Sequence, residues 1–170
     1  MVLSFDFARK RSWIFPVLIY TVLIVGIITS VYTAITVHSI NKKDLIDRVN
    51  TIAQSIKANE IESLSASSLD LENPIYIEIK DLITKVRGVN SDIRFIYLNG
   101  LNEQGMFFYM DSESPDSDFY SPPGEPYPEA TPLMRQLFQT KESGFEIATD
   151  RWGLWASVYV PIISQDTNRV

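Results

Sequence analysis

The sequence feature that most constrains this chain is a long uncharged stretch near its N-terminus. No Asp, Glu, Lys or Arg occurs from residue 12 to residue 41, and residues 13–37 read WIFPVLIYTVLIVGIITSVYTAITV. As an α-helix, this stretch would extend about 37 Å, which is enough to cross a hydrocarbon core of roughly 30 Å with some tilt. The sequence therefore predicts a transmembrane helix over residues 13–38.

Two other interpretations of this stretch are less favoured. A cleaved signal peptide has a shorter apolar core of about 7–15 residues, followed by small residues at the cleavage site. Residues 33–38 read TAITVH, which is a poor cleavage signature. A buried helix of a soluble protein is the second alternative, but an uncharged stretch of this length that begins beside basic residues favours a membrane anchor.

The charges on either side of the stretch predict its orientation. Arg9, Lys10 and Arg11 precede it against a single acidic residue, Asp6, whereas almost all of the chain's acidic residues follow it. Basic residues on a short flank keep that flank in the cytoplasm. We therefore expect a single-pass protein of the cell (inner) membrane, with a cytoplasmic N-terminus at 1–12 and an extracytoplasmic region at 39–170.

Composition excludes several classes of function. The chain has 170 residues, no cysteine, one histidine and a formal net charge of −6. Without cysteine there are no disulfides, thiolate zinc sites or iron–sulfur clusters. A Ser-His-Asp triad would depend on His38 alone, and the acidic balance argues against nucleic acid as a partner. We expect no cofactor, no metal site and no catalytic module in this chain.

Beyond the apolar stretch, residues 41–64 are expected to continue as a helix leaving the bilayer. Leu45, Val49, Ile52 and Ile56 recur at spacings of four, three and four, which places them in one apolar stripe. The stripe is too short to establish a coiled coil. It could pack on this protein's own domain or against the same helix of a dimer partner, and both remain open.

The remaining elements are predicted from caps, alternation and turn residues. Asn73-Pro74 is a helix start, and we expect a helix to residue 87, although Ile75, Ile77 and Ile79 also alternate like a strand. Aromatic and β-branched residues predict a hairpin from residues 93–98 and 106–110, with turn signals at Asn99-Gly100 and Gln104-Gly105. Both faces of this hairpin are apolar, so we expect it to be central in a sheet covered on both sides.

A long proline-rich loop at 112–132 follows, then a short helix at 132–140 and two strands at 145–148 and 154–160. The aromatic residues of the proline-rich loop indicate that this loop is ordered and packs back on the domain. Residues 165–169 read as a polar turn with a strand on one side only. This pattern indicates a fragment, after which we expect one further strand and an output module.

Two segments resemble the ectodomains of bacterial membrane receptors: DSESPDSDFYSPPG at 111–124 and DRWGLWAS at 150–157. With the order of elements above, the region 40–170 is similar to the extracytoplasmic PAS-like sensor fold called Cache or PDC, found in histidine kinases and diguanylate cyclases. The resemblance implies an α+β domain with an antiparallel sheet whose last strand is missing here. It also implies a ligand-sensing, homodimeric receptor of a two-component or related signalling system.

Aromatic residues are the best candidates for a ligand pocket within this fold. Strand alternation places Trp155, Ser157 and Tyr159 on one face of their strand, while sheet, loop and short helix together could enclose a small solute. The alternative is that the tryptophans are simply core. The predicted ligand-binding residues are Arg94, Tyr97, Tyr109, Asp111, Trp152, Trp155 and Tyr159.

Seven acidic residues and no basic residue lie between Arg94 and Arg135. An EF-hand starting at Asp111 is excluded, because its sixth and twelfth positions hold Asp116 and Pro122. We therefore expect a solvated acidic loop rather than a cation site. The sequence as a whole favours a membrane-anchored sensor of a small solute. The alternative is a membrane-anchored protein-interaction module without a small ligand, and an anchored enzyme is the least favoured class.

Overall fold

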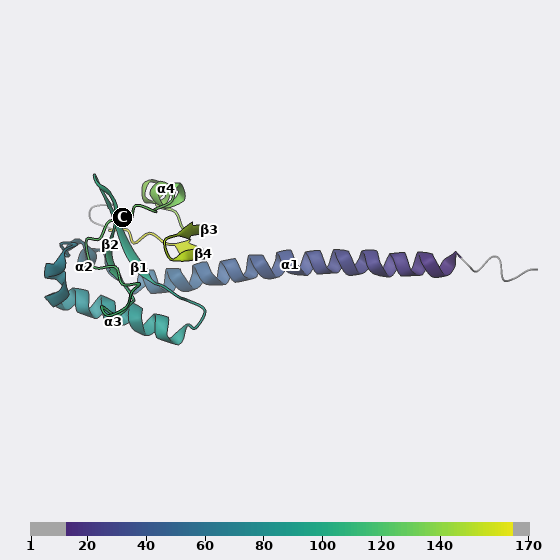
Figure 1. Cartoon of the computed structure of the whole chain (residues 1–170), viewed down its shortest axis with the longest axis horizontal. Coiled ribbons are helices and arrows are strands. Elements are labelled where there is room, and N and C mark those ends of the chain that lie inside the picture. The colour runs from purple at the N-terminus through teal and green to yellow at the C-terminus, as the bar shows by residue number, and fades with distance from the viewer. Residues whose placement is uncertain (1–12, 165–170) are drawn as a thin grey trace, which may run out of the picture. The chain divides into compact units, whose positions relative to one another are not determined.

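The computed structural model describes residues 13–164, apart from the side chains of residues 38, 40 and 41. The predicted cytoplasmic segment 1–12 and the polar turn at 165–169 lie outside the described residues. The chain divides into two compact units between Lys43 and Asp44 (Figure 1), and each unit is described by itself below.

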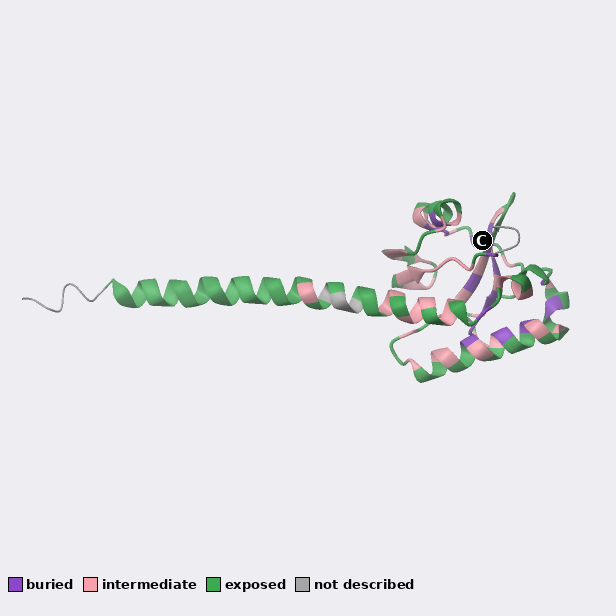
Figure 2. Cartoon of the chain, turned by 180° about the vertical axis from the view of Figure 1, so that it is seen from behind, coloured by how far each residue is buried: buried purple, intermediate pink, exposed green. Residues whose placement is uncertain are grey.

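The first unit, as far as it is described, consists of one helical stretch. It belongs to α1, which runs from Ile14–Gln54. From residue 13 to residue 35 every residue is exposed, including bulky side chains such as Phe15, Tyr20 and Tyr32, as the green ribbon in Figure 2 shows. Among the described residues, α1 is the one helix that is long enough and apolar enough to cross a membrane.

The predicted exit helix is interrupted. α1 ends at Gln54, and a short helix, α2, follows at Ala58–Glu62. The break has a backbone cause: Ser55 and Ile56 donate to carbonyls three residues back, and Lys57 is extended at φ −87° and ψ 129°. The interruption turns Ile56 into the core of the second unit, so this part of the stripe packs on the protein's own domain.

The helix predicted after Asn73 is confirmed. A 3-10 helix, η1, spans Ser68–Glu72, and α3 spans Pro74–Val89. The Asn73 side chain accepts a hydrogen bond from the backbone N–H of Ile75 at 2.9 Å, as expected for an N-cap. Ile79 is buried while Ile77 is 53% exposed, so the burial follows the helical period and not the strand alternation.

The first hairpin exists, but its boundaries differ from the prediction. β1 spans Tyr97–Asn102 and β2 spans Gly105–Asp111, so residues 93–96 are not strand and Asn99-Gly100 lies inside β1. Gly100 is needed there for packing: a Cβ on it would meet the rings of Phe107 and Tyr109. The glycine that signalled a turn instead makes room for two aromatic side chains.

The expectation that this hairpin is central in a larger sheet is wrong for the described residues. β1 and β2 form a two-stranded antiparallel sheet. Residues 112–131 contain no helix or strand apart from a single β-bridge between Pro126 and Phe107, and this loop packs back as expected, with Tyr127 buried. α4 spans Pro132–Thr140 as predicted, and β3 (Gly144–Asp150) and β4 (Gly153–Tyr159) form a second two-stranded sheet.

The second unit is therefore a mixed helix-and-strand domain with two core clusters. One lies between α3 and the first hairpin and is centred on Ile83, Leu98 and Met110. The other holds Phe108 and Tyr127, with α4 and the second hairpin packed against it. Figures 1 and 2 show α3 beside β1 and β2, with α4 next to β3 and β4, and Figure 2 shows buried residues gathered in α3 and the first hairpin.

Candidate functional site: an aromatic cluster and an adjoining cleft

A cluster of aromatic side chains joins the two hairpins of the second unit. Phe95, just before β1, stacks on Tyr97 with ring centroids 5.5 Å apart and meets Trp155 of β4 edge-on at 5.1 Å. Trp152, in the turn before β4, lies 6.3 Å from the ring of Tyr97. Three of the predicted ligand-binding residues, Tyr97, Trp152 and Trp155, are thus brought together.

Asp150 organises the polar side of this cluster. Its carboxylate accepts hydrogen bonds from the backbone N–H of Trp152 at 2.8 Å and from the indole N–H of Trp155 at 3.0 Å. The hydroxyl of Tyr127 donates to the other oxygen at 3.3 Å. One carboxylate therefore fixes the β3–β4 turn, a tryptophan ring and the proline-rich loop.

Two tyrosines at the border of the cluster differ in whether their hydroxyls have a hydrogen-bond partner. Tyr159 donates to Glu146 at 2.9 Å, whereas the buried hydroxyl of Tyr97 has no partner among the described residues. Burial raises the pKa of both phenols well above the ordinary value, so both are neutral hydrogen-bond donors at pH 7. Because the Tyr97 hydroxyl is unpaired, it is the group best placed to bond to an incoming molecule.

Asp111 is held in a network that accounts for its burial without a ligand. It is fully buried, and it accepts from the backbone N–H of Ser121 at 2.6 Å, from that of Glu113 at 2.9 Å and from Lys80 Nζ at 3.2 Å. Burial raises the pKa of this carboxyl, and the bonds from Ser121 and Lys80 oppose the rise. The lysine thereby joins α3 to the start of the proline-rich loop.

Glu113 corrects the expectation of a solvated acidic loop. It is buried and pairs with Arg87 and Arg94, while Ser117 donates to its second oxygen at 2.7 Å. Burial raises the pKa of Glu113, but the bonds from Ser117 and Arg94 and the nearby guanidinium charges outweigh this and lower it overall. Basic residues that lie far away in the sequence therefore neutralise the most buried acids of the loop.

Arg94 is half exposed and sits on the aromatic surface beside this pair. Its guanidinium carbon lies 4.2 Å from the ring centroid of Phe95 and 5.0 Å from that of Phe119. Such stacking leaves part of the guanidinium open to solvent. Of the two charged residues predicted to reach a ligand, Arg94 is thus the accessible one.

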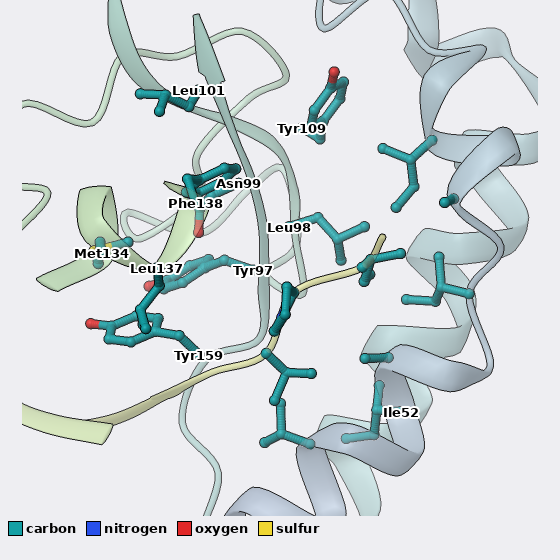
Figure 3. Close-up of a pocket in the computed structure, with 18 of the residues that line it drawn as sticks. Ile52, Tyr97, Leu98, Asn99, Leu101, Tyr109, Met134, Leu137, Phe138 and Tyr159 are labelled. Carbon is teal, nitrogen blue, oxygen red and sulfur yellow. The ribbon is translucent and has the colours of Figure 1, made fainter. Parts of the chain in front are cut away.

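A cleft of about 600 Å³ adjoins the cluster, within the size range of small-molecule sites. Figure 3 shows it between β1, α4 and the end of α1. Tyr97, Tyr109 and Tyr159 line it, whereas the other four predicted ligand-binding residues do not. The predicted residues therefore divide between the cleft, the aromatic cluster and the network around Asp111 and Glu113.

Sequence reasoning missed several residues that build this site. Phe95, Tyr127 and Asp150 contact the predicted aromatics, and Lys80 lies on α3, far away in the sequence. The sequence offered one usable signal, the Asp at the start of the predicted β3–β4 turn, because Asp side chains commonly bond to backbone N–H groups two residues on. Among the described residues, no group of three or more metal-ligating side chains could hold an ion.

The arrangement can bind a small molecule by stacking and hydrogen bonding, because it offers aromatic faces, a neutral phenol donor and an accessible guanidinium. Comparison of this chain with protein-family models, curated proteins and solved structures found no match.

Proposed function

We propose that this chain is the membrane-anchored, ligand-sensing part of a receptor, that it crosses the membrane once, and that its second unit lies outside the cytoplasmic membrane. The observation that carries the proposal is the pairing of two features in one chain. The first is an apolar helix whose side chains have no cover within the described residues. The second is a mixed domain with aromatic side chains gathered around a polar centre.

The uncovered helix supports the membrane assignment. Large apolar side chains that no protein atoms cover need another apolar environment, and a bilayer supplies one. The basic triplet at 9–11 supports a cytoplasmic N-terminus. On this proposal the receptor is homodimeric, and a cytoplasmic output module, of the histidine kinase or diguanylate cyclase kind, requires a second membrane crossing by the receptor polypeptide.

The aromatic cluster supports a small-solute site. The proposed contacts are Arg94, Tyr97, Trp152 and Trp155, with Tyr109 and Tyr159 at the adjoining cleft, whereas Asp111 holds the loop in place and does not reach the solute. Residues that stack and that donate hydrogen bonds from neutral groups suit a small organic solute better than a metal ion. Signalling requires that this solute bind two arrangements of the receptor with different affinity.

A thermal-shift experiment tests the proposal. The full chain in lipid nanodiscs is heated with amino acids, carboxylates, amines and divalent cations, and unfolding is followed by tryptophan fluorescence. A solute that binds only the folded state at a hundred times its Kd adds about 2.7 kcal/mol of stability. We expect one solute class to raise the Tm in a dose-dependent manner.

Matched variants locate the response. Arg94→Gln removes the accessible guanidinium and is expected to abolish the shift, and Trp155→Phe is expected to weaken it. Lys85→Gln, which removes an exposed lysine paired with Asp81, is the control and keeps the full shift. A well-folded protein that responds to none of the solutes contradicts the sensor proposal and favours a protein-interaction module.

A further inference from the structure

One edge of β1 opens into the cleft described above. The lining includes Tyr97, Asn99 and Leu101, whose side chains lie on one face of this strand, and Leu98, whose side chain lies on the other face. In Figure 3, Asn99 and Leu101 stand on the side of α4, and Leu98 stands on the opposite side of the strand. A cavity that is lined from both faces of a strand adjoins the edge of that strand, where the backbone groups are presented.

The hydrogen bonds of β2 show which backbone groups of β1 lie at this edge. On the far side of the hairpin, the backbone N–H of Phe108 donates to the carbonyl of Glu125 at 3.0 Å, and that of Tyr127 donates to the carbonyl of Met106 at 2.8 Å. Two residues opposite each other in an antiparallel pair either bond to each other through the backbone or both turn these groups outward. Phe108 and Met106 turn outward, so their partners in β1 do the same.

Those partners are Asn99 and Leu101, and alternation along the strand adds Tyr97 to the same set. Within residues 13–164, the backbone N–H and C=O groups of these three residues have no hydrogen-bond partner outside the hairpin. The proline-rich loop thus satisfies the edge of β2, whereas the edge of β1 is open. Leu101 is 41% exposed, so the cleft is accessible at this edge. An open row of donors and acceptors is a template for pairing with an extended chain.

The walls on the two sides of this edge are apolar. α4 contributes Met134, Leu137 and Phe138 on one side, and the end of α1 contributes Val49 and Ile52 on the other side. A chain that pairs with β1 as a strand sends alternate side chains toward these two walls. Both sets of side chains therefore have to be apolar to be buried there favourably.

The charged residues that line the cleft are both acidic. Glu62 lies at the end of α2 and Glu142 follows α4, and both are exposed. Among the described residues, no Lys or Arg lines the cleft. The electrostatic potential at the mouth of the cleft therefore favours a partner that carries positive charge beside its apolar part.

We propose that this cleft binds an extended peptide of a separate partner protein, apolar in its centre and basic at its ends, which pairs as a strand with the open edge of β1. The backbone groups of β1 supply the pairing, and the apolar walls and the two glutamates select the side chains. Arg94, Trp152 and Trp155 do not line the cleft, so this peptide site is separate from their stacking surface and does not depend on the small-solute proposal.

Hydrogen exchange on the full chain in nanodiscs tests the proposal. The probe is the end-blocked peptide Lys-Val-Ala-Val-Ala-Val-Lys, whose Kd is first measured by fluorescence anisotropy. At a peptide concentration of about ten times the Kd, we expect the amides of Tyr97, Asn99 and Leu101 to exchange about tenfold more slowly, because exchange then requires the peptide to leave. The amides of Leu98 and Gly100, which face β2, change less.

Two control peptides separate the contribution of the backbone from that of charge. Proline at the central position removes a donor and prevents regular pairing, so this peptide is expected to leave the three amides unprotected at the same concentration. Glutamate in place of both lysines is expected to raise the Kd several-fold, and added salt reduces this difference. Equal binding of the glutamate peptide would overturn the basic character assigned to the partner.

Two variants of the chain locate the site. Glu142→Lys is expected to raise the Kd of the lysine peptide several-fold. Glu72→Lys makes the same charge change at an exposed position outside the cleft, at the end of η1, and is expected to leave the Kd unchanged. The proposal is overturned if both variants have equal effects, if the three amides already exchange slowly without peptide, if the lysine peptide fails to protect them, or if the proline peptide protects them equally well.

Discussion

At the scale of single residues, the buried charges of the second unit hold the proline-rich loop in place. Lys80 donates to the carboxylate of Asp111 and to the backbone carbonyls of Asp111 and Glu113. Its side chain is 18% exposed and that of Asp111 is fully buried. A buried carboxylate that loses its cationic partner keeps its desolvation cost, so this pair matters far more than a surface ion pair.

Lys80→Met is therefore expected to destabilise the second unit by about 3–5 kcal/mol, because it leaves Asp111 buried and unpaired. Lys85→Met is the matched control on the same helix. Lys85 and its partner Asp81 are both largely exposed, so its loss is expected to cost under about 1 kcal/mol. Urea unfolding of the full chain, followed by tryptophan fluorescence, measures both values, and equal costs would contradict the stabilising role of the Lys80–Asp111 pair.

The lowered pKa of Glu113 predicts how the stability of the fold depends on pH. Its folded pKa lies below the ordinary value of 4.5. It therefore stabilises the fold above that pH and loses this contribution as the pH falls through the folded value. The effect of Asp111 on stability has the opposite sign. Because its folded pKa is raised above the ordinary value of 3.8, its contribution to stability falls as the pH rises above 3.8.

Glu113→Gln is expected to lower stability at pH 7 and to make the remaining stability less sensitive to acid below pH 4.5. The measurement is urea unfolding at a series of pH values from neutral to acid, with wild type in parallel. A variant that loses stability on acidification as steeply as the wild type contradicts the assignment.

At the scale of elements, a close backbone contact fixes the proline-rich loop against the bend between α2 and η1. Gly124 has a φ of +87°, and a Cβ there would collide with the backbone carbonyl oxygen of Ala66. Gly105, at the start of β2, also has a positive φ of +122° but has open space where a Cβ would lie. Any other residue would have a strained backbone at both positions, but only at position 124 would its Cβ also collide with a neighbouring backbone atom.

Gly105→Ala is expected to cost about 1–3 kcal/mol from strain alone. Gly124→Ala is expected to cost a further 1–3 kcal/mol or so, because a backbone carbonyl cannot rotate away as a side chain can. Denaturant unfolding of both variants measures the difference. If Gly124→Ala is no worse than Gly105→Ala, the loop does not pack against Ala66 as described.

The sequence predicts those elements whose signals are local. α3 and α4 begin at a capping residue followed by proline, Asn73-Pro74 and Thr131-Pro132, and both helices form where predicted. The hairpin boundaries are not predictable from local signals, because Gly100 lies inside β1, where the rings of Phe107 and Tyr109 leave no room for a Cβ. The same holds for the end of α1, where Ile56 leaves the helical stripe to enter the core.

The candidate site was only partly predictable for the same reason. Trp152 and Trp155 are close in sequence, and the short turn before β4 lets both rings contact Phe95. The role of Asp111 as an anchor for the loop depends on Lys80, thirty-one residues earlier. No sequence pattern pairs those two residues, so the acidic segment is expected from sequence to be solvated, although the carboxylates of Asp111 and Glu113 are buried.

At the scale of the whole molecule, a sensing function requires that the first unit lie in a membrane and the second unit on one side of it. The first unit offers a helix with its apolar side chains exposed, and the second unit carries the aromatic cluster and the cleft. If the helix anchors the chain, the second unit occupies a single side of the bilayer. The charge distribution predicts the extracytoplasmic side.

The most direct test of this claim is cysteine accessibility, since the chain contains no cysteine and each introduced thiol is unique. Glu103→Cys places a thiol in the exposed turn between β1 and β2, and Ser4→Cys places one before the basic triplet. In right-side-out membrane vesicles, an impermeant maleimide is expected to label position 103 at once and position 4 only after permeabilisation. The reverse pattern, or recovery of the protein outside the membrane fraction, would contradict the account.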